Sequence, residues 1–294
     1  MKIARRCVCC EGASLTRSPA IVMPFLAWRV FGWQSVDITA DWKLRDVAPG
    51  RAYALCNTLA CMSCGLIFLD MRFDDEEMSA LYADYRGDTY RMDRERFEPG
   101  YGHRNDLLLA GSNYIPRVEE LLEPHLSAAP RILDWGGDTG VNTPFRARCG
   151  CHHVYDISVR PLVGGAVRVT RNDVAASTYD LVVLSHVLEH VSFPRDVIAD
   201  IIPVLTRDTL LYIELPHENL MRLEISIASK SSMKRHWHEH INFFTERAIE
   251  TLLDQAGLET LMCISHSIVA GGQPGHVFSL LARLKPGTHA ICAR

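Results

Sequence analysis

The sequence predicts an α/β protein built around a doubly wound sheet of seven strands, with a small cysteine-rich module before it. Three observations lead to this prediction. From residue 131 onward, short apolar runs alternate with helical patterns, as in sheets that carry helices on both faces. The first run ends in a bend with two adjacent glycines, and two Cys-x2-Cys pairs lie within the first 64 residues. The 294 residues, of which 48% are hydrophobic, suffice for one large core or two modest ones.

Seven apolar runs are interpreted as the strands of the sheet, and the last two as an antiparallel pair that closes it. The strands are expected at residues 131–135, 152–158, 166–173, 179–191 (where the strand runs into a turn), 209–216, 260–270 and 275–284. Helices are expected at residues 143–150, 193–205 and 245–259. Thr143, Pro144 and Gly150 suit the start and the end of the first of these helices.

Composition divides the chain into two predicted domains, a module with its connecting helix at residues 1–100 and the sheet domain at 101–294. In the first domain, residues 66–70 have the pattern of a strand. Residues 74–86 have that of a helix whose first turn is acidic, as the helix dipole favours. Residues 87–104 are charged and contain glycine and proline, so an exposed connection is expected there.

Four of the six cysteines in the first 64 residues form two Cys-x2-Cys pairs. The predicted metal ligands are Cys7, Cys10, Cys61 and Cys64. The spacing lets a tight turn aim two thiolates at one ion, which indicates a tetrahedral zinc site, with Cys9 or Cys56 as a replacement for a neighbouring ligand. The pairs lie about 50 residues apart, more than in a compact zinc ribbon, and buried apolar cysteines or a disulfide are the alternatives. Four thiolates leave no open position for water, so a structural role is expected.

Charge and hydropathy disfavour two classes of partner. Lysine and arginine number 31 against 35 acidic residues, a formal charge of −4, and the two signs are mixed along the chain, so no basic field attracts nucleic acid. The N-terminus has no apolar segment of a secretory signal. The apolar run at 20–33 contains Arg29 and is too short, at about 14 residues, to span a bilayer. We expect a cytoplasmic protein without membrane or nucleic-acid partners, and leave its oligomeric state open.

The glycine bend predicts a ligand site, because ligands of doubly wound sheets bind beyond the carboxyl ends of the strands. The pattern consists of Asp134, Gly136, Gly137 and Gly140. Trp135 stands where a dinucleotide-binding fingerprint needs its first glycine. The pattern resembles the first motif of the class I S-adenosylmethionine-dependent methyltransferases, whose fold is Rossmann-like, and this implies that the bend holds the methionine half of the cofactor. Asp138 replaces the family's middle glycine, so its side chain would either crowd the ligand or face the cofactor's cationic groups.

Three residues after later strands match the same family. Asp156 ends the second predicted strand, where an acid accepts hydrogen bonds from the ribose hydroxyls. The resemblance implies that Asp173 receives the adenine amino group and that His186 faces the cleft near the reactive methyl. Either acid alone also suits an ordinary turn, but the three in this order after a glycine bend strengthen the prediction.

Two further segments, 185–191 (SHVLEHV) and 236–245 (HWHEHINFFT), carry histidines and glutamates. Apolar neighbours shift the pKa values of such side chains toward pH 7, where a general base is useful. In the second segment, a metal site made by His238 and His240 is the alternative to a catalytic base, since side chains two apart on an extended segment point the same way. In the first segment, a structural role is favoured over a catalytic one for Glu189.

These segments and the cysteine pairs together resemble the sugar C-methyltransferase family and its relatives. Those proteins join a zinc module with two CxxC pairs to this fold and carry a Tyr-His-Glu-His stretch. Glu239 and His240 match the final Glu and His, which in that family serve the substrate, with His as the candidate base. Trp237 stands in place of the Tyr, and an indole cannot accept a proton. The chain is also shorter than that family, which has an extra C-terminal domain.

The resemblance therefore implies an S-adenosylmethionine-dependent methyltransferase with a structural zinc. We expect O- or C-methylation of a sugar, a nucleotide-sugar or a related natural-product intermediate. His240 is the expected general base, and Glu239 and His186 complete the predicted catalytic set. A zinc-containing RNA methyltransferase and a non-catalytic protein with a decayed cofactor pocket are the alternatives, of which the mixed charge disfavours the first.

Overall fold

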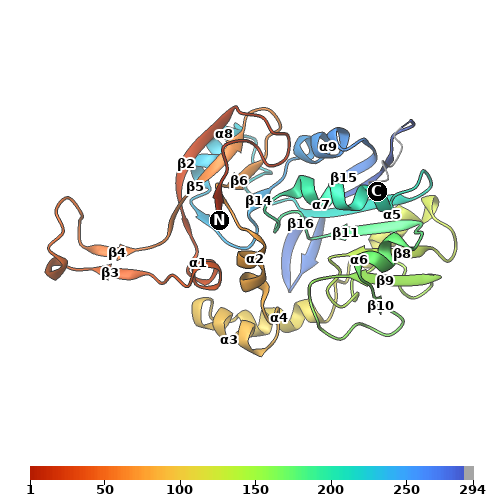
Figure 1. The fold of residues 1–294 in the computed structure, drawn as a ribbon, viewed down its shortest axis with the longest axis horizontal. Helices are drawn as coiled ribbons and strands as arrows, with labels where there is room; N and C mark the ends of the chain where they lie inside the picture. Colours follow the sequence, from red (N-terminus) through yellow and green to blue (C-terminus); the bar gives the residue numbers. More distant parts are fainter. Residues whose placement is uncertain (288–294) are drawn as a thin grey trace.

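The computed structural model describes residues 1–287 and contains the predicted seven-stranded sheet (Figure 1). The strand order is β10-β9-β8-β11-β12-β16-β15. The first five strands of this row run parallel, and β16 pairs antiparallel with both β12 and β15. The strands are β8 (Arg131–Trp135), β9 (Cys151–Tyr155), β10 (Val167–Arg168), β11 (Leu181–Ser185), β12 (Leu210–Pro216), β15 (Leu258–Ala270) and β16 (Gln273–Leu284). The predicted fold class and its closing antiparallel pair are confirmed.

The three central strands are apolar along nearly their whole length, because both faces of the sheet are covered. Residues Ile132 to Trp135 of β8 are buried, as are the first four residues of β11 and the first six of β12. The helices of this part are α5 (Ile115–Leu122), α6 (Arg171–Ala175), α7 (Pro194–Ile201) and α9 (Glu246–Gln255). The helices predicted at 193–205 and 245–259 correspond to α7, which continues as a 3-10 turn at Ile202–Val204, and to α9.

The helix predicted at residues 143–150 is wrong, because the chain forms successive turns there. Phe145 has a φ of 59°, in the left-handed region that an L-residue does not adopt inside a helix. The Thr143 hydroxyl donates to the Asp134 carboxylate instead of capping a helix. Thr, Pro and Gly occur in turns as well as at helix ends, and here a contact with the neighbouring strand decides for the turns.

The exposed connection predicted at residues 87–104 is also wrong, because two helices, α3 (Asp88–Phe97) and α4 (Tyr101–Leu109), occupy it. Tyr90, Arg94, Tyr101 and Asn105 are buried. Their spacing of four within each helix places each pair on one helical face. The high charge of the segment hid this face, since one of its buried members is an arginine. The preceding helix, predicted at 74–86, is α2 (Asp75–Tyr82), which starts with a capping box made by Asp74 and Glu77.

A second sheet of five strands, in the order β13-β2-β5-β6-β14, draws on both ends of the chain. Its strands are β2 (Leu15–Val22), β5 (Leu55–Cys61), β6 (Ile67–Leu69), β13 (His236–Trp237) and β14 (Asn242–Phe243). β6 confirms the strand predicted at 66–70. β13 and β14 flank the histidine-rich segment, so this segment is held at both ends by the N-terminal part of the chain. The domain boundary near residue 100 stays a prediction.

The remaining elements surround these two sheets. They are β1 (Lys2–Ile3) paired with β7 (Met71–Arg72), β3 (Val36–Ile38) paired with β4 (Gly50–Ala52), α1 (Pro24–Phe31), α8 (Ile227–Met233), and 3-10 turns at Ala40–Trp42 and Glu123–His125. The β3–β4 ribbon projects as an arm, at the left of Figure 1. Within residues 1–287, none of the helices has the length and apolarity needed to cross a membrane.

One buried cluster connects the cysteine-rich region with the seven-stranded sheet. Cys7, Leu66 and Phe68 pack into the same core as Leu184 of β11 and Phe244 before α9. The N-terminal region is therefore anchored on the edge of the sheet where β11 and β12 end, and it contributes to the surroundings of the site described next.

Candidate active site and metal centre

The four predicted zinc ligands converge in the structure. One atom from each of Cys7, Cys10, Cys61 and Cys64 lies within 4.8 Å of all the others. The Sγ atoms of Cys7 and Cys64 are 3.6 Å apart and those of Cys10 and Cys61 3.5 Å. Zinc–sulfur bonds of about 2.3 Å in a tetrahedron place sulfurs about 3.8 Å apart, so the cluster fits zinc. Burial raises the pKa of Cys10 to about 11, and a bound cation would displace such protons.

The two candidate replacement ligands lie outside this group of four. Cys9 Sγ donates to the backbone carbonyl of Ala248 in α9, at 3.0 Å. Cys56 is buried in a different apolar cluster. The Thr245 hydroxyl, which caps α9, also donates to the carbonyl of Cys64. The cysteine cluster thus holds the start of α9.

The glycine bend leaves β8 as a tight corner. Gly136 has a φ of 83°, and a Cβ there would lie 2.5 Å from Val187 in the loop after β11. A Cβ at Gly137 would overlap the Asp134 carboxylate, and one at Gly140, where φ is 76°, would lie 3.0 Å from the His152 ring. Glycine is therefore required at all three positions, in part by the packing of the chain itself.

Asp134 lies beneath this corner with only 4% of its surface exposed. Its carboxylate accepts from the Thr143 hydroxyl. Burial raises the pKa of Asp134 to about 7, because the one hydroxyl partner offsets little of the cost of burying the charge.

Asp138 and Asp156 lie together at the same corner. Asp138 has a φ of 51°, in the left-handed region that glycine adopts most readily. Its backbone N–H donates to Asp156 Oδ2 at 2.7 Å, and Asp156 Oδ1 accepts from the N–H of Ser158 at 2.6 Å. Arg160 holds Asp138 Oδ2 at 2.8 Å, whereas Asp138 Oδ1 is buried without a partner. This orphaned acceptor and the glycines fit a ligand with cationic groups, such as S-adenosylmethionine.

Asp173 has a structural partner that the sequence did not predict. It sits at the third position of α6 and forms a capping box with Thr170. Its hydrogen bonds with Thr170 lower the pKa of Asp173. Its contact with adenine stays a prediction.

His186 directly follows β11 and has a φ of 55°. Its Nδ1 lies 3.0 Å from Glu189 Oε1 and its Nε2 3.1 Å from Glu214 Oε1. Burial lowers the pKa of His186, but the hydrogen bonds with these two buried carboxylates outweigh it and raise the pKa to about 10. His186 is therefore a protonated bridge between two carboxylates, with the Tyr114 hydroxyl 3.3 Å from its Nε2. Its place near the reactive methyl stays a prediction.

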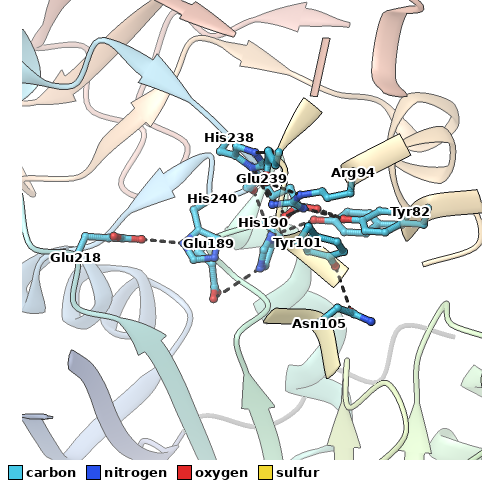
Figure 2. Close-up of polar contacts among 12 residues, drawn as sticks. Tyr82, Arg94, Tyr101, Asn105, Glu189, His190, Glu218, His238, Glu239 and His240 are labelled. Carbon is cyan, nitrogen blue, oxygen red and sulfur yellow. Dashed lines mark hydrogen bonds and ion pairs between the residues drawn. The ribbon is translucent and has the colours of Figure 1, made fainter. Parts of the chain in front are cut away.

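Glu239 is bound on both carboxylate oxygens by α3, the helix that was expected to be a loop. The Tyr90 hydroxyl donates to its Oε1, and the Arg94 guanidinium donates to its Oε2 (Figure 2). Burial raises the pKa of Glu239, but Arg94 and His238 outweigh it and lower the pKa to about 2. Glu239 is therefore a fixed anion with its lone pairs engaged, which suits positioning more than proton transfer.

His240 and His190 meet edge to face, with ring centroids 4.7 Å apart at 85°. His240 Nδ1 lies 2.8 Å from Glu218 Oε1, and the hydrogen bond with this carboxylate, against the effect of burial, raises the pKa of His240. His190 Nδ1 lies 3.2 Å from the backbone carbonyl of Glu239. Burial lowers the pKa of His190 to about 4, so this imidazole is neutral at pH 7. Figure 2 shows both rings beside Glu189.

His238 and His240 do not form the metal site considered from their spacing. His238 Nε2 is bound to the Glu98 carboxylate, and its Nδ1 accepts from the backbone N–H of Glu239 at 2.9 Å. In the described residues, the group of potential ligands that contains His240 includes Glu189 and His190 instead. The chain turns between β13 and β14, so the two side chains do not follow the alternation of an extended strand.

Several residues of the site were not predicted. Tyr90 and Arg94 were assigned to a loop, although their i, i+4 spacing was a detectable signal. Glu214 and Glu218 lie at the end of β12 and just after it, where ligands of such sheets bind. The backbone carbonyl of Glu189 accepts from the N–H groups of Ile241 and Asn242, whereas a structural role for its side chain stays a prediction.

A protein-family profile described as "Methyltransferase domain" matches residues 102–262, more than half of the chain. A solved 1,6-didemethyltoxoflavin-N1-methyltransferase of Burkholderia thailandensis is 17% identical, with a TM-score of 0.49, over 76% of this chain and 97% of that one. An S-adenosylmethionine-dependent methyltransferase of Methanosarcina mazei is 14% identical, with a TM-score of 0.40, over 56% and 98%. The magnesium protoporphyrin IX methyltransferase of Synechocystis is 13% identical, with a TM-score of 0.40, over 63% and 84%. No curated protein matches the chain significantly.

Proposed function

Because this chain belongs to the methyltransferase-domain family, as a class I S-adenosylmethionine-dependent enzyme, we propose that it methylates a hydroxyl group or an activated carbon of a sugar, a nucleotide-sugar or a related small molecule. The observation that carries the proposal is the pairing of His240 with Glu218. The imidazole donates from Nδ1 to the carboxylate, so in its neutral form Nε2 carries the lone pair, and no protein group in the described residues hydrogen-bonds to Nε2.

S-adenosylmethionine, when bound, supplies a methyl group on a cationic sulfur that is already a good leaving group. Asp138, Asp156 and the three glycines would hold it at the end of β8. The part left to the chain is to align the acceptor and take its proton. His240 Nε2 would take the proton of the acceptor, and Glu218 would stabilise the imidazolium that results. The products are the methylated acceptor, S-adenosylhomocysteine and one proton on His240.

A sugar-like acceptor suits the polar walls around His240. Glu239 is fixed by Tyr90 and Arg94 and lies beside His238, which is held by Glu98. Such preorganised polar groups bind hydroxyls with little loss of side-chain entropy. The resemblance of residues 236–245 to the sugar C-methyltransferases points to the same class of acceptor, and the Trp237 substitution favours a base other than tyrosine.

The test compares the turnover of His240→Ala with that of the unmodified protein on a panel of nucleotide-linked sugars. Turnover is measured as the release of S-adenosylhomocysteine. Loss of a general base costs about 10²- to 10⁴-fold in rate. Calorimetry should show unchanged binding of S-adenosylmethionine, because His240 is not among the cofactor residues.

His153→Gln provides the control, since this histidine bonds Tyr179 on the outer part of the sheet. Unchanged turnover in His240→Ala would remove His240 from the mechanism. Methylation of RNA but of no small hydroxylated compound would contradict the proposed substrate class.

A further inference from the structure

We propose that Glu189, His190 and His240 form a binding site for one divalent transition-metal ion, separate from the cysteine cluster. This site goes beyond the proposed methyl transfer, in which His240 acts as a base when no ion is bound. Four features of the structure support it: the convergence of the three side chains, the direction of their free nitrogens, an orphaned carboxylate oxygen and the rigidity of the backbone.

The three side chains converge on one point. Each offers one ligand atom, and these atoms lie within 4.8 Å of one another. His190 Nε2 is 3.8 Å from Glu189 Oε1, which is the separation of two atoms on a shared ion rather than of a hydrogen bond. Two of the ligands come from the loop after β11 and the third from the segment between β13 and β14 (Figure 2).

Hydrogen bonds on the far side of each ring aim its free nitrogen at the centre. The carboxylate of Glu218 only accepts, so His240 donates from Nδ1. His190 Nδ1 lies 3.0 Å from the Tyr82 hydroxyl and 3.2 Å from the carbonyl of Glu239, and the tautomer that donates to this carbonyl carries its proton on Nδ1. In that tautomer of His190, and in the neutral form of His240, the lone pair is on Nε2. A carbonyl or carboxylate behind each imidazole is the arrangement that orients histidine ligands in metal sites.

Glu189 supplies the negative charge that a cation requires. The residue is 1% exposed, its Oε1 bonds His186 at 3.0 Å, and its Oε2 is buried without a partner. A buried carboxylate oxygen without a partner is costly. A metal ion bound by this carboxylate and the two imidazoles would offset the cost of its buried charge.

The backbone holds the ligands in register before any ion arrives. The N–H groups of Ile241 and Asn242 both donate to the carbonyl of Glu189, at 2.8 and 3.1 Å. Asn242 Nδ2 donates to the carbonyls of Leu188 and Val191. The two segments that carry the ligands are thereby cross-linked on either side of the site, which lowers the entropic cost of binding.

Two imidazoles and one carboxylate favour zinc, nickel, cobalt or iron(II) over magnesium and calcium, which prefer oxygen ligands. Three protein ligands leave coordination positions open. The site therefore differs from the cysteine cluster, whose four thiolates would enclose their ion.

The experiment titrates Ni²⁺ into protein whose cysteine cluster is already loaded with zinc, by calorimetry. We expect one additional equivalent of Ni²⁺ per chain, with a nitrogen and oxygen shell and no sulfur in its X-ray absorption spectrum. Glu218→Gln should weaken binding by about 10- to 100-fold, as changes behind a ligating histidine do. His190→Ala and Glu189→Gln should weaken it at least as much.

His238→Gln is the matched control, because both nitrogens of this neighbouring histidine already have protein partners. It should leave Ni²⁺ binding unchanged. Circular dichroism and zinc content verify that each variant is folded. The proposal is overturned if no additional equivalent binds, if the spectrum shows sulfur ligands, or if His238→Gln weakens binding as much as His190→Ala. None of these measurements uses methyl transfer, so the two proposals fail independently.

Discussion

Two groups of side chains in this protein could bind a metal ion, but they are built differently. One is the cysteine cluster, and the other, the histidine cluster, consists of His186, Glu189, His190, Glu239 and His240. The four thiols of the cysteine cluster have mainly one another as partners, and burial raises the pKa of Cys10. In the histidine cluster, most charges are already paired by the protein, Glu239 by Arg94 and His186 by two carboxylates. The cysteine cluster therefore offers four thiols to a metal ion. The histidine cluster has most of its charges balanced by protein groups, and its few unpaired atoms are the candidates for chemistry.

The largest expected effect is the loss of zinc from the cysteine cluster. Cys61→Ser removes one of four thiolates, so zinc content should fall well below one per chain and thermal stability should drop sharply. Structural zinc contributes about 10–16 kcal/mol in small zinc peptides, and here the cluster anchors the start of α9. Metal analysis and thermal unfolding monitor the change.

Cys56→Ser is the control for this substitution, because Cys56 is a buried cysteine outside the cluster. The Cys56→Ser protein should retain its zinc. Equal zinc content and melting temperature in Cys61→Ser and the unmodified protein would break the comparison, since the cluster would then be ordinary core packing.

The next largest effect tests the internal pairing of the histidine cluster. Arg94 and Glu239 are nearly buried, with 7% and 14% of their side chains exposed. Arg94→Met leaves the Glu239 carboxylate buried without its cation, which should lower the free energy of unfolding by about 3–5 kcal/mol. Urea denaturation measures this loss. Arg94→Met combined with Glu239→Gln should recover much of it, whereas a loss below about 1 kcal/mol would indicate an exposed pair.

Asp134 extends the comparison, because it is a buried carboxylate without a cationic partner and its effect on the stability of the fold should depend on pH. Burial raises the pKa of Asp134 from 3.8 to about 7, so the folded state holds the proton more tightly than the unfolded state. The stabilising effect of the protonated form is complete below about pH 4 and is lost as the pH rises to about 7. The shift corresponds to about 4 kcal/mol.

Asp134→Asn should remove this contribution. Urea denaturation of both proteins at several pH values between 4 and 8 tests it, because all other titrating groups are common to the two. Identical pH dependence in the two proteins would mean that folding leaves the pKa of Asp134 unchanged.

The parts of the site that could be predicted are those in which neighbouring residues carry the signal. The cysteine pairs, the glycines after Asp134, and Glu239 with His240 all stand within short segments. The partners of these residues could not be predicted in the same way. Arg94 reaches Glu239 across 145 positions of the chain, and its helix was concealed by its charge. Glu218 is recognisable as a partner only once the loop after β12 is folded beside His240.

The sequence by itself determined the seven strands of the main sheet, the helices α7 and α9, and the corner at the end of β8. These follow from hydrophobic periodicity and from glycine's access to positive φ, which act between neighbouring residues. Only the tertiary structure decided that His240 faces His190 and Glu189 rather than His238, and that Thr143 serves Asp134 rather than a helix. Those outcomes depend on which distant side chains satisfy a buried charge or hydrogen bond, and burial is a property of the whole packed chain.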